Sequence, residues 1–197
     1  MLSLRLLKFP HLLKIYLLKI TKLVHPPELV PDEQEARLKK AMRKCEVWAN
    51  KAWFAVRDNG SLRRRYFGTD SDKHIKSIQR SYNAIEDACD LTKDNIPFRC
   101  EHSTSDCTSK RGNPLNAFVY RHENRVYICP DFFDYSTNDV NINARTLIHE
   151  LSHLESIRGT RDYGNGYGLE KVKSLGKSES LMDADTFAYF ASEAAGY

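Results

Sequence analysis

The feature that most constrains this chain is a pair of histidines four residues apart, in the run HELSH from His149 to His153. Apolar residues on both sides of the run keep the spacing of a helix, and on a helix two side chains four residues apart share one face. Both imidazoles can therefore bind one metal ion. Glu150 follows the first histidine, where its carboxylate can reach a water on that ion as a general base without binding the ion itself. The sequence thus predicts a helix that carries two metal ligands and a base.

A third ligand is expected from the segment that follows the helix. Asp162 lies nine residues after His153, and Gly159 between them can end the helix and turn the chain back. A zinc ion held by three protein ligands keeps a fourth position for water, lowers the pKa of that water to about 7 and polarises a carbonyl group. Asp162 is therefore the natural third ligand. The alternative is an aspartate that caps a helix or forms a turn.

These motifs resemble those of the deuterolysin-type metallopeptidases, the aspzincins, a family that includes fungal neutral proteases and lysine-specific metalloendopeptidases. The resemblance rests on HELSH, on Gly159-Thr160-Arg161-Asp162 followed by Tyr167-Gly168, and on DADTFAYFA at residues 183–191. It spans roughly residues 40–195 and leaves the N-terminal residues unexplained. It implies an α+β, zincin-like fold that is mainly helical, with a small β-hairpin or sheet and an active-site helix.

The resemblance also implies the chemistry of the site. One Zn2+ ion would be bound by His149, His153 and Asp162, with Glu150 as the general base. The activity would be that of a zinc metalloendopeptidase, which hydrolyses peptide bonds in protein or peptide substrates with a metal-activated water.

Two further roles are implied at positions that depart from the family's pattern. The tyrosine that stabilises the oxyanion corresponds most closely to Tyr167, but its distance from Asp162 is two residues longer than usual, so Tyr163 is the substitute. In lysine-specific members the second acid of the late acidic motif faces the residue after the scissile bond. Asp185 is therefore the candidate for binding a substrate Lys, and a solvated or helix-capping aspartate is the alternative. Asp183 stands where the family usually has Asn.

Patterns of apolar and turn-forming residues predict the remaining elements. The expected elements are a helix from Asp32 to Asn59-Gly60, a helix from Thr69 or Ser71 to Cys89, a loop over residues 95–116, a hairpin of strands at 117–120 and 126–129, and helix again from about Asn143.

Residues 1–24 differ in charge from the rest of the chain. They hold five of the 30 basic residues and none of the 26 acidic ones, so the remaining residues sum to −1. Their imperfect basic amphipathic pattern predicts contact with a membrane surface or a targeting role, and the alternatives are a propeptide or a helix packed on its own domain. Prolines at positions 26, 27 and 31 indicate a linker. We therefore expect an N-terminal segment at 1–30 and a metallopeptidase domain at 31–197.

The near-neutral body argues against a nucleic-acid partner, and we expect a monomer. An alternative function is a non-catalytic or toxin-like module, in which the N-terminal segment binds membranes and the zincin-like domain is a scaffold. A scaffold does not require His149, Glu150, His153 and Asp162 all to be present, and the sequence has all four.

None of the five cysteines has the CxxC spacing of a zinc finger or a redox motif. The family resemblance implies disulfides between Cys45 and Cys100 and between Cys107 and Cys129, with Cys89 free. Such pairs form in an oxidising compartment, which predicts a secreted protein. Association with a membrane through the N-terminal segment is the further expectation. The alternative is five reduced thiols in a cytosolic protein.

Overall fold

The structure is a computed structural model that describes residues 32–197 apart from 94, 102–104, 135–138 and 165–166. The predicted N-terminal segment, residues 1–30, lies outside the described residues, so its role and the division of the chain at residue 30 stay predictions. In the described part of the chain, no helix has both the length and the apolar character needed to cross a membrane.

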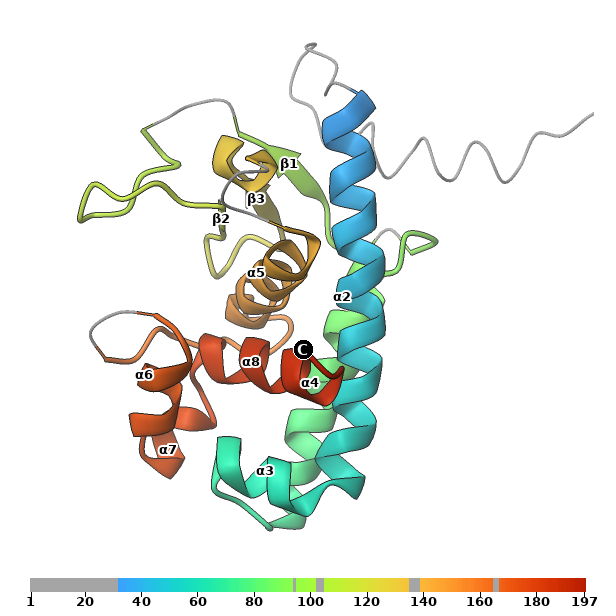
Figure 1. The fold of residues 1–197 in the computed structure, drawn as a ribbon, viewed down its shortest axis with the longest axis vertical. Coiled ribbons are helices and arrows are strands. Elements are labelled where there is room, and N and C mark those ends of the chain that lie inside the picture. Colours follow the sequence, from blue (N-terminus) through green and yellow to red (C-terminus); the bar gives the residue numbers. More distant parts are fainter. Residues whose placement is uncertain (1–31, 94, 102–104, 135–138, 165–166) are drawn as a thin grey trace, which may run out of the picture.

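Helices dominate the described residues, and a small sheet lies toward one end of the molecule, as the α+β prediction required (Figure 1). The elements in chain order are α2 (Asp32–Asp58), α3 (Gly60–Phe67), α4 (Asp72–Cys89), β1 (Phe98–Cys100), β2 (Ala117–Phe118), β3 (Val126–Ile128), the 3-10 helix η1 (Pro130–Phe133), α5 (Val140–His153), α6 (Leu169–Ser174), α7 (Lys177–Ser180) and α8 (Ala184–Ala194).

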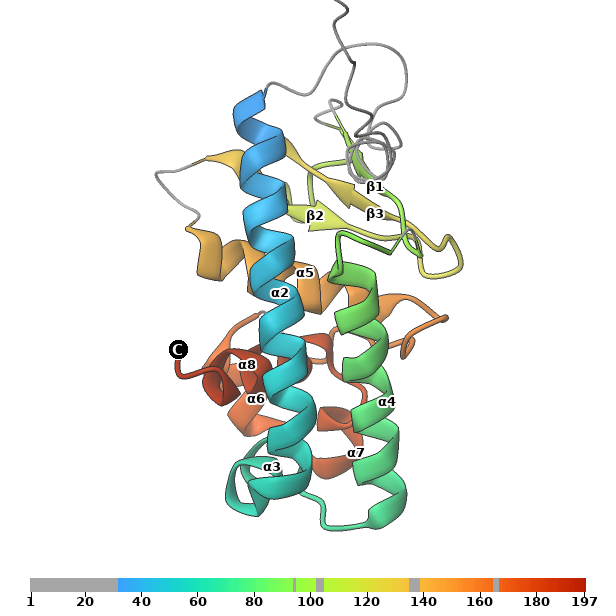
Figure 2. The same ribbon diagram turned by 90° about the vertical axis from the view of Figure 1, so that its right-hand side faces the viewer.

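The long helix α2 runs along the molecule beside α4, and the sheet lies toward the end at which α2 begins (Figure 2). The buried residues of α2 recur at helical spacing, among them Met42, Trp48 and Val56. Ile78, Tyr82 and Ile85 form the corresponding buried face of α4. Both amphipathic helices were predicted from this spacing, and the structure confirms them.

The segment that ends α2 also starts a helix that was not predicted. Asn59 caps α3, because its side-chain oxygen accepts a hydrogen bond of 3.0 Å from the Leu62 amide. Arg63 then lies buried and donates to the carbonyl oxygens of Val56 and Thr69 at 2.7 and 3.0 Å. An Asn-Gly pair predicts a turn, and here its side chain begins a helix instead.

Aromatic side chains form the part of the core that holds α8 in place. The ring of Phe187 lies 5.2 Å from that of Phe67 and 5.4 Å from that of Tyr82, centroid to centroid, and Phe190 lies 5.1 Å from Phe67. The Tyr82 hydroxyl donates a 2.9 Å hydrogen bond to the Phe187 carbonyl oxygen, so this buried polar group is satisfied. These contacts join α8 to α3 and α4 and thereby fix the start of α8.

The sheet has the strand order β1-β3-β2, in which β2 pairs antiparallel and β1 pairs parallel with β3. The predicted hairpin of β2 and β3 is confirmed, with shorter strands than expected. The prediction that residues 95–116 form a loop is wrong at β1. Phe98 and Cys100 point inward and are buried there, and the strand gains backbone partners from β3 that a local sequence pattern does not reveal.

One of the two disulfides differs from the prediction. Cys107 is bonded to Cys129, as predicted, but Cys45 is bonded to Cys89, and Cys100 is a buried free thiol. The packing of α2 against α4 explains the difference, since it places Cys45 and Cys89 with their Cα atoms 6.0 Å apart, within the usual range for a disulfide. Cys100 instead lies on β1 against β3.

We expect chemical labelling to identify Cys100 as the free thiol of the full chain. Burial raises the pKa of this thiol to about 11, so little thiolate is present near neutral pH and alkylation of the native protein should be slow. Unfolding without reduction should expose it to iodoacetamide, and peptide mapping by mass spectrometry should then place the label on Cys100. A label on Cys89, or a peptide that links Cys45 to Cys100, would contradict this pairing.

Candidate metal centre

Helix α5 presents the HELSH run from a firmly packed position. Asp139 caps the helix by accepting hydrogen bonds from the amides of Asn141 and Ile142. Leu147, Ile148 and Leu151 are fully buried on the side that faces the core. The helix ends at His153, so both histidines lie in its last turns on the face opposite those apolar side chains.

The chain then turns back along the end of α5. Gly159 has a φ of +71°, in the left-handed region that favours glycine, and its carbonyl oxygen accepts a 2.7 Å hydrogen bond from Arg121. The Thr160 amide donates to the Ser152 carbonyl oxygen at 3.1 Å, and Arg161 forms a parallel bridge with Asp183. This return brings Asp162 to the two histidines, as the sequence predicted for a glycine at this position.

The three predicted ligand atoms meet in a small triangle. His149 Nε2 lies 3.1 Å from His153 Nε2, and Asp162 Oδ1 lies 3.3 Å from the first nitrogen and 3.5 Å from the second. In a tetrahedral zinc site with bonds of about 2.0–2.1 Å, neighbouring ligand atoms lie about 3.3–3.4 Å apart. The observed triangle therefore has the size that a zinc ion requires, and the donor set of two imidazoles and one carboxylate fits zinc.

The second nitrogen of each imidazole is held by an acceptor. His149 Nδ1 donates to Asp185 Oδ1 at 2.8 Å, and His153 Nδ1 donates to the Thr160 carbonyl oxygen at 3.1 Å. When Nδ1 carries the proton, the lone pair of a neutral imidazole lies on Nε2. Both rings are thus oriented with their free nitrogen toward the centre of the triangle, which is the arrangement found around bound metals.

A charged donor set lies in this partly enclosed space. Burial acts to lower the pKa of His149, but hydrogen bonds to Asp162 and Asp185 outweigh burial and raise it well above its ordinary value. Burial acts to raise the pKa of Asp162, but hydrogen bonds from both histidines hold it well below its usual range. The site therefore favours a positive charge between these atoms, whether a proton or a metal ion.

The predicted base lies beside the ligands on the same helix. Burial raises the pKa of the Glu150 carboxyl, while the charges of His149 and His153 act in the opposite direction. A carboxylate with a raised pKa is a stronger base than an exposed one, which suits a group that takes a proton from water near neutral pH.

The ring of Tyr167 lies close to the metal ligands. Its centroid is 6.0 Å from that of His149, and its side chain is largely exposed to solvent. Partial burial and the negative charges of Asp162 and Glu150 raise its pKa, so the hydroxyl group keeps its proton and can donate a hydrogen bond. Tyr163 is fixed through its backbone, where its amide donates to Asp183 Oδ1 at 3.1 Å. Tyr167 therefore stays the predicted donor to the oxyanion, with Tyr163 as its substitute.

Asp185 is buried, and both of its carboxylate oxygens already accept hydrogen bonds from the protein. Its side chain is 8% exposed, and its two oxygens accept hydrogen bonds from His149 Nδ1 and from the Gly168 amide, both at 2.8 Å. Sequence reasoning missed this contact with His149. The general tendency of a metal-binding histidine to donate to a carboxylate is the signal that could have found it.

Sequence reasoning gave no role to two charged residues that lie behind the ligands. Asp183 is fully buried and caps α8 by accepting from the Thr186 amide, and Lys171 of α6 lies 2.5 Å from its other oxygen. No sequence motif links a lysine in α6 with the residue that caps α8.

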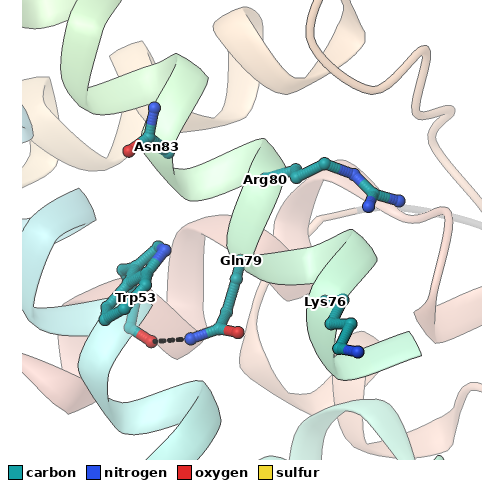
Figure 3. Close-up of a pocket in the computed structure, with 5 residues that line it drawn as sticks. All are labelled: Trp53, Lys76, Gln79, Arg80 and Asn83. Carbon is teal, nitrogen blue, oxygen red and sulfur yellow. Dashed lines mark hydrogen bonds between the residues drawn. The ribbon is translucent and has the colours of Figure 1, made fainter. Parts of the chain in front are cut away.

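A separate hollow of about 360 Å3 lies where α2 packs on α4 (Figure 3). None of the predicted site residues line it. Its lining residues are Trp53, Lys76, Gln79, Arg80 and Asn83.

Replacing Gly159 with Ala should destabilise the return loop. A Cβ there would lie 3.3 Å from Arg121 Nη2, and a left-handed φ costs a non-glycine residue about 1–2 kcal/mol. Gly112 is the matched control, because its φ is +81° and a Cβ there would have nothing within 4 Å. In urea denaturation we expect a larger loss of unfolding free energy for Gly159→Ala than for Gly112→Ala. Equal losses would show that the contact with Arg121 has no effect.

Residues 52–192 match the aspzincin family, described as lysine-specific metallo-endopeptidase. A neutral protease 2 homolog of Phaeosphaeria nodorum is 31% identical over 158 residues, which are 77% of this chain and 43% of that protein. A peptidyl-Lys metalloendopeptidase of Armillaria mellea is 38% identical over 90 residues, 44% of this chain and 25% of that protein. The chain thus spans less than half the length of these relatives.

A solved structure shows a similar fold. It is described as a zinc peptidase from Grifola frondosa, and it is similar with a TM-score of 0.66 and 22% sequence identity. The similarity covers 84% of this chain and 98% of that chain, so it includes most of the elements described above.

Proposed function

This chain belongs to the aspzincin family of lysine-specific metallo-endopeptidases, and we propose that it hydrolyses peptide bonds in protein or peptide substrates with one bound zinc ion. The observation that carries the proposal is the triangle formed by His149 Nε2, His153 Nε2 and Asp162 Oδ1, with edges of 3.1, 3.3 and 3.5 Å. Its size and its donor atoms suit a zinc ion, and an ion with three protein ligands keeps a fourth position for water or substrate.

His149, His153 and Asp162 would hold the zinc ion. Bound there, the ion would polarise the scissile carbonyl and lower the pKa of water in the site. Asp185 and Thr160 would keep the two imidazoles in the orientation that the ion needs, through the hydrogen bonds at Nδ1.

The chain's own groups supply the proton transfers. The Glu150 carboxylate would take a proton from the attacking water and then give it to the nitrogen of the leaving amine. The Tyr167 hydroxyl would donate a hydrogen bond to the oxygen that gains negative charge in the transition state, and its exposed position leaves room for substrate beside it.

Replacing Glu150 with Gln should remove the base and leave the metal ligands in place. We expect kcat/KM on an unfolded protein substrate to fall by about 100- to 10,000-fold, with zinc content unchanged. Glu170→Gln is the matched control, because Glu170 is exposed on α6 and pairs only with nearby Lys173 among its described contacts. Undiminished cleavage by Glu150→Gln would exclude this mechanism.

We also propose a preference for Lys after the scissile bond, which the family description supports together with the name of the Armillaria relative. Asp185 is the predicted partner of that Lys. The contacts of Asp185 with His149 and Gly168 support a second role, in which it orients a zinc ligand.

An Asp185→Asn variant separates these two roles. Loss of orientation should weaken zinc binding by about 10- to 100-fold, measured by competition with a chelator. Loss of a substrate contact alone should leave zinc binding unchanged and should lower the ratio of kcat/KM between peptides with Lys and with Leu after the scissile bond. Asp106→Asn, at an exposed position outside the predicted ligand set, is the control. Unchanged zinc binding and an unchanged ratio would exclude both roles.

The disulfides support a secreted location for this protein. Cys45–Cys89 and Cys107–Cys129 are bonds of a kind that persists in oxidising compartments. Contact of residues 1–24 with a membrane surface and a monomeric state stay predictions. No observation favours the alternative of a non-catalytic membrane-binding module, whereas the assembled ligand set favours an enzyme.

A further inference from the structure

Lys171 is a buried cation behind the proposed metal site. It lies on α6, next to the start of α8 (Figure 1), and its side chain is 8% exposed. Its Nζ lies 2.5 Å from Asp183 Oδ1 and 3.7 Å from Asp185 Oδ2. Lysine is almost never buried unless it is paired, and here it is paired with two carboxylates at once.

Each of these carboxylates is connected to a different metal ligand. Asp185 accepts the hydrogen bond of 2.8 Å from His149 Nδ1. Asp183 accepts one of 3.1 Å from the amide of Tyr163, the residue directly after Asp162. The ammonium group is thus linked through Asp185 to His149 on α5. Through Asp183 it is linked to the return loop that carries Asp162.

We propose that Lys171 is a positioning residue of the metal site and that it acts as a matched pair with Asp183. The proposal rests on the zinc site of the proposed function. Asp183 is fully buried, and a buried charge that loses its partner is strongly unfavourable. Without Lys171, the return loop can move so that water reaches Asp183, which lowers the free-energy cost of its unpaired charge. Asp162 moves with that loop.

Loss of the charge on Asp183 should disturb the other metal ligand, His149. Among the described residues, Lys171 then keeps Asp185 as its one charged partner, at 3.7 Å. Its ammonium group and the His149 imidazole compete for the same carboxylate, which weakens the orientation of His149. Removal of both charges together leaves neither group unpaired. The two single substitutions should therefore be harmful and the double substitution should not be their sum.

The test is a double-mutant cycle in the full chain, with the zinc dissociation constant as its readout. It is measured by competition with a chromophoric chelator for the wild type, Lys171→Met, Asp183→Asn and the combination. Each single variant should bind zinc about 10- to 100-fold more weakly than the wild type. The combined variant should bind more tightly than either single one, and Lys171→Arg, which keeps the charge, should bind more tightly than Lys171→Met.

The control substitution removes another lysine of α6. Lys173→Met changes an exposed lysine of the same helix, paired with Glu170, and should bind zinc like the wild type. Removing a positive charge would by itself strengthen the binding of a cation. Unchanged or tighter zinc binding by Lys171→Met would therefore overturn the proposal, as would losses that simply add in the combined variant.

Failures of other kinds are distinguishable from these outcomes. A purely structural role for Lys171 would lower the thermal stability of the metal-free chain and leave the zinc affinity of the folded fraction unchanged, which counts against the proposal. If Lys171→Met does not fold, the comparison of Asp183→Asn with the combined variant decides, and weaker zinc binding by the combination overturns the proposal. A wild-type chain that binds no zinc would contradict the proposed function itself.

Discussion

Two backbone hydrogen bonds hold the ligand loop against the start of α8, and the site depends on them. The Arg161 amide donates to the Met182 carbonyl oxygen at 2.9 Å, and the Ala184 amide donates to the Arg161 carbonyl oxygen at 3.1 Å. They place Asp162 on one side of the histidines and Asp185 on the other. Because α8 is itself fixed by aromatic packing in the core, the positions of the ligands follow from the stability of the whole domain.

Charge balance is the second constraint on this site. Several carboxylates lie within or next to it, and Asp183 and Asp185 are buried. Buried carboxylates persist only when they are paired and hydrogen-bonded. The ammonium group of Lys171 neutralises charge on Asp183 and Asp185. The two histidines, with the ion that we propose between them, neutralise the charge of Asp162. Protein cations and the proposed ion would thus share the neutralisation of one acidic cluster.

The grouping of His149, His153 and Asp162, the proposed metal ligands, could be predicted from sequence because its geometry is local. Spacing along one helix turn places His149 beside His153, and one glycine explains the return of Asp162. The other features depend on contacts between distant segments. β1 needs a partner strand, and the disulfide of Cys89 depends on how α2 packs against α4. Lys171 reaches Asp183 across two short helices, and no periodic pattern along the chain encodes such a contact.

The central claim is that His149, His153 and Asp162 hold one zinc ion. Zinc-edge X-ray absorption on the purified full chain, together with elemental analysis, tests it most directly. We expect one zinc per chain, bound by two imidazole nitrogens and by oxygen at about 2.0–2.2 Å, and loss of that zinc when both histidines are replaced with Ala. A chain without stoichiometric zinc, a sulfur ligand in the spectrum, or zinc retained by the double histidine variant would contradict it.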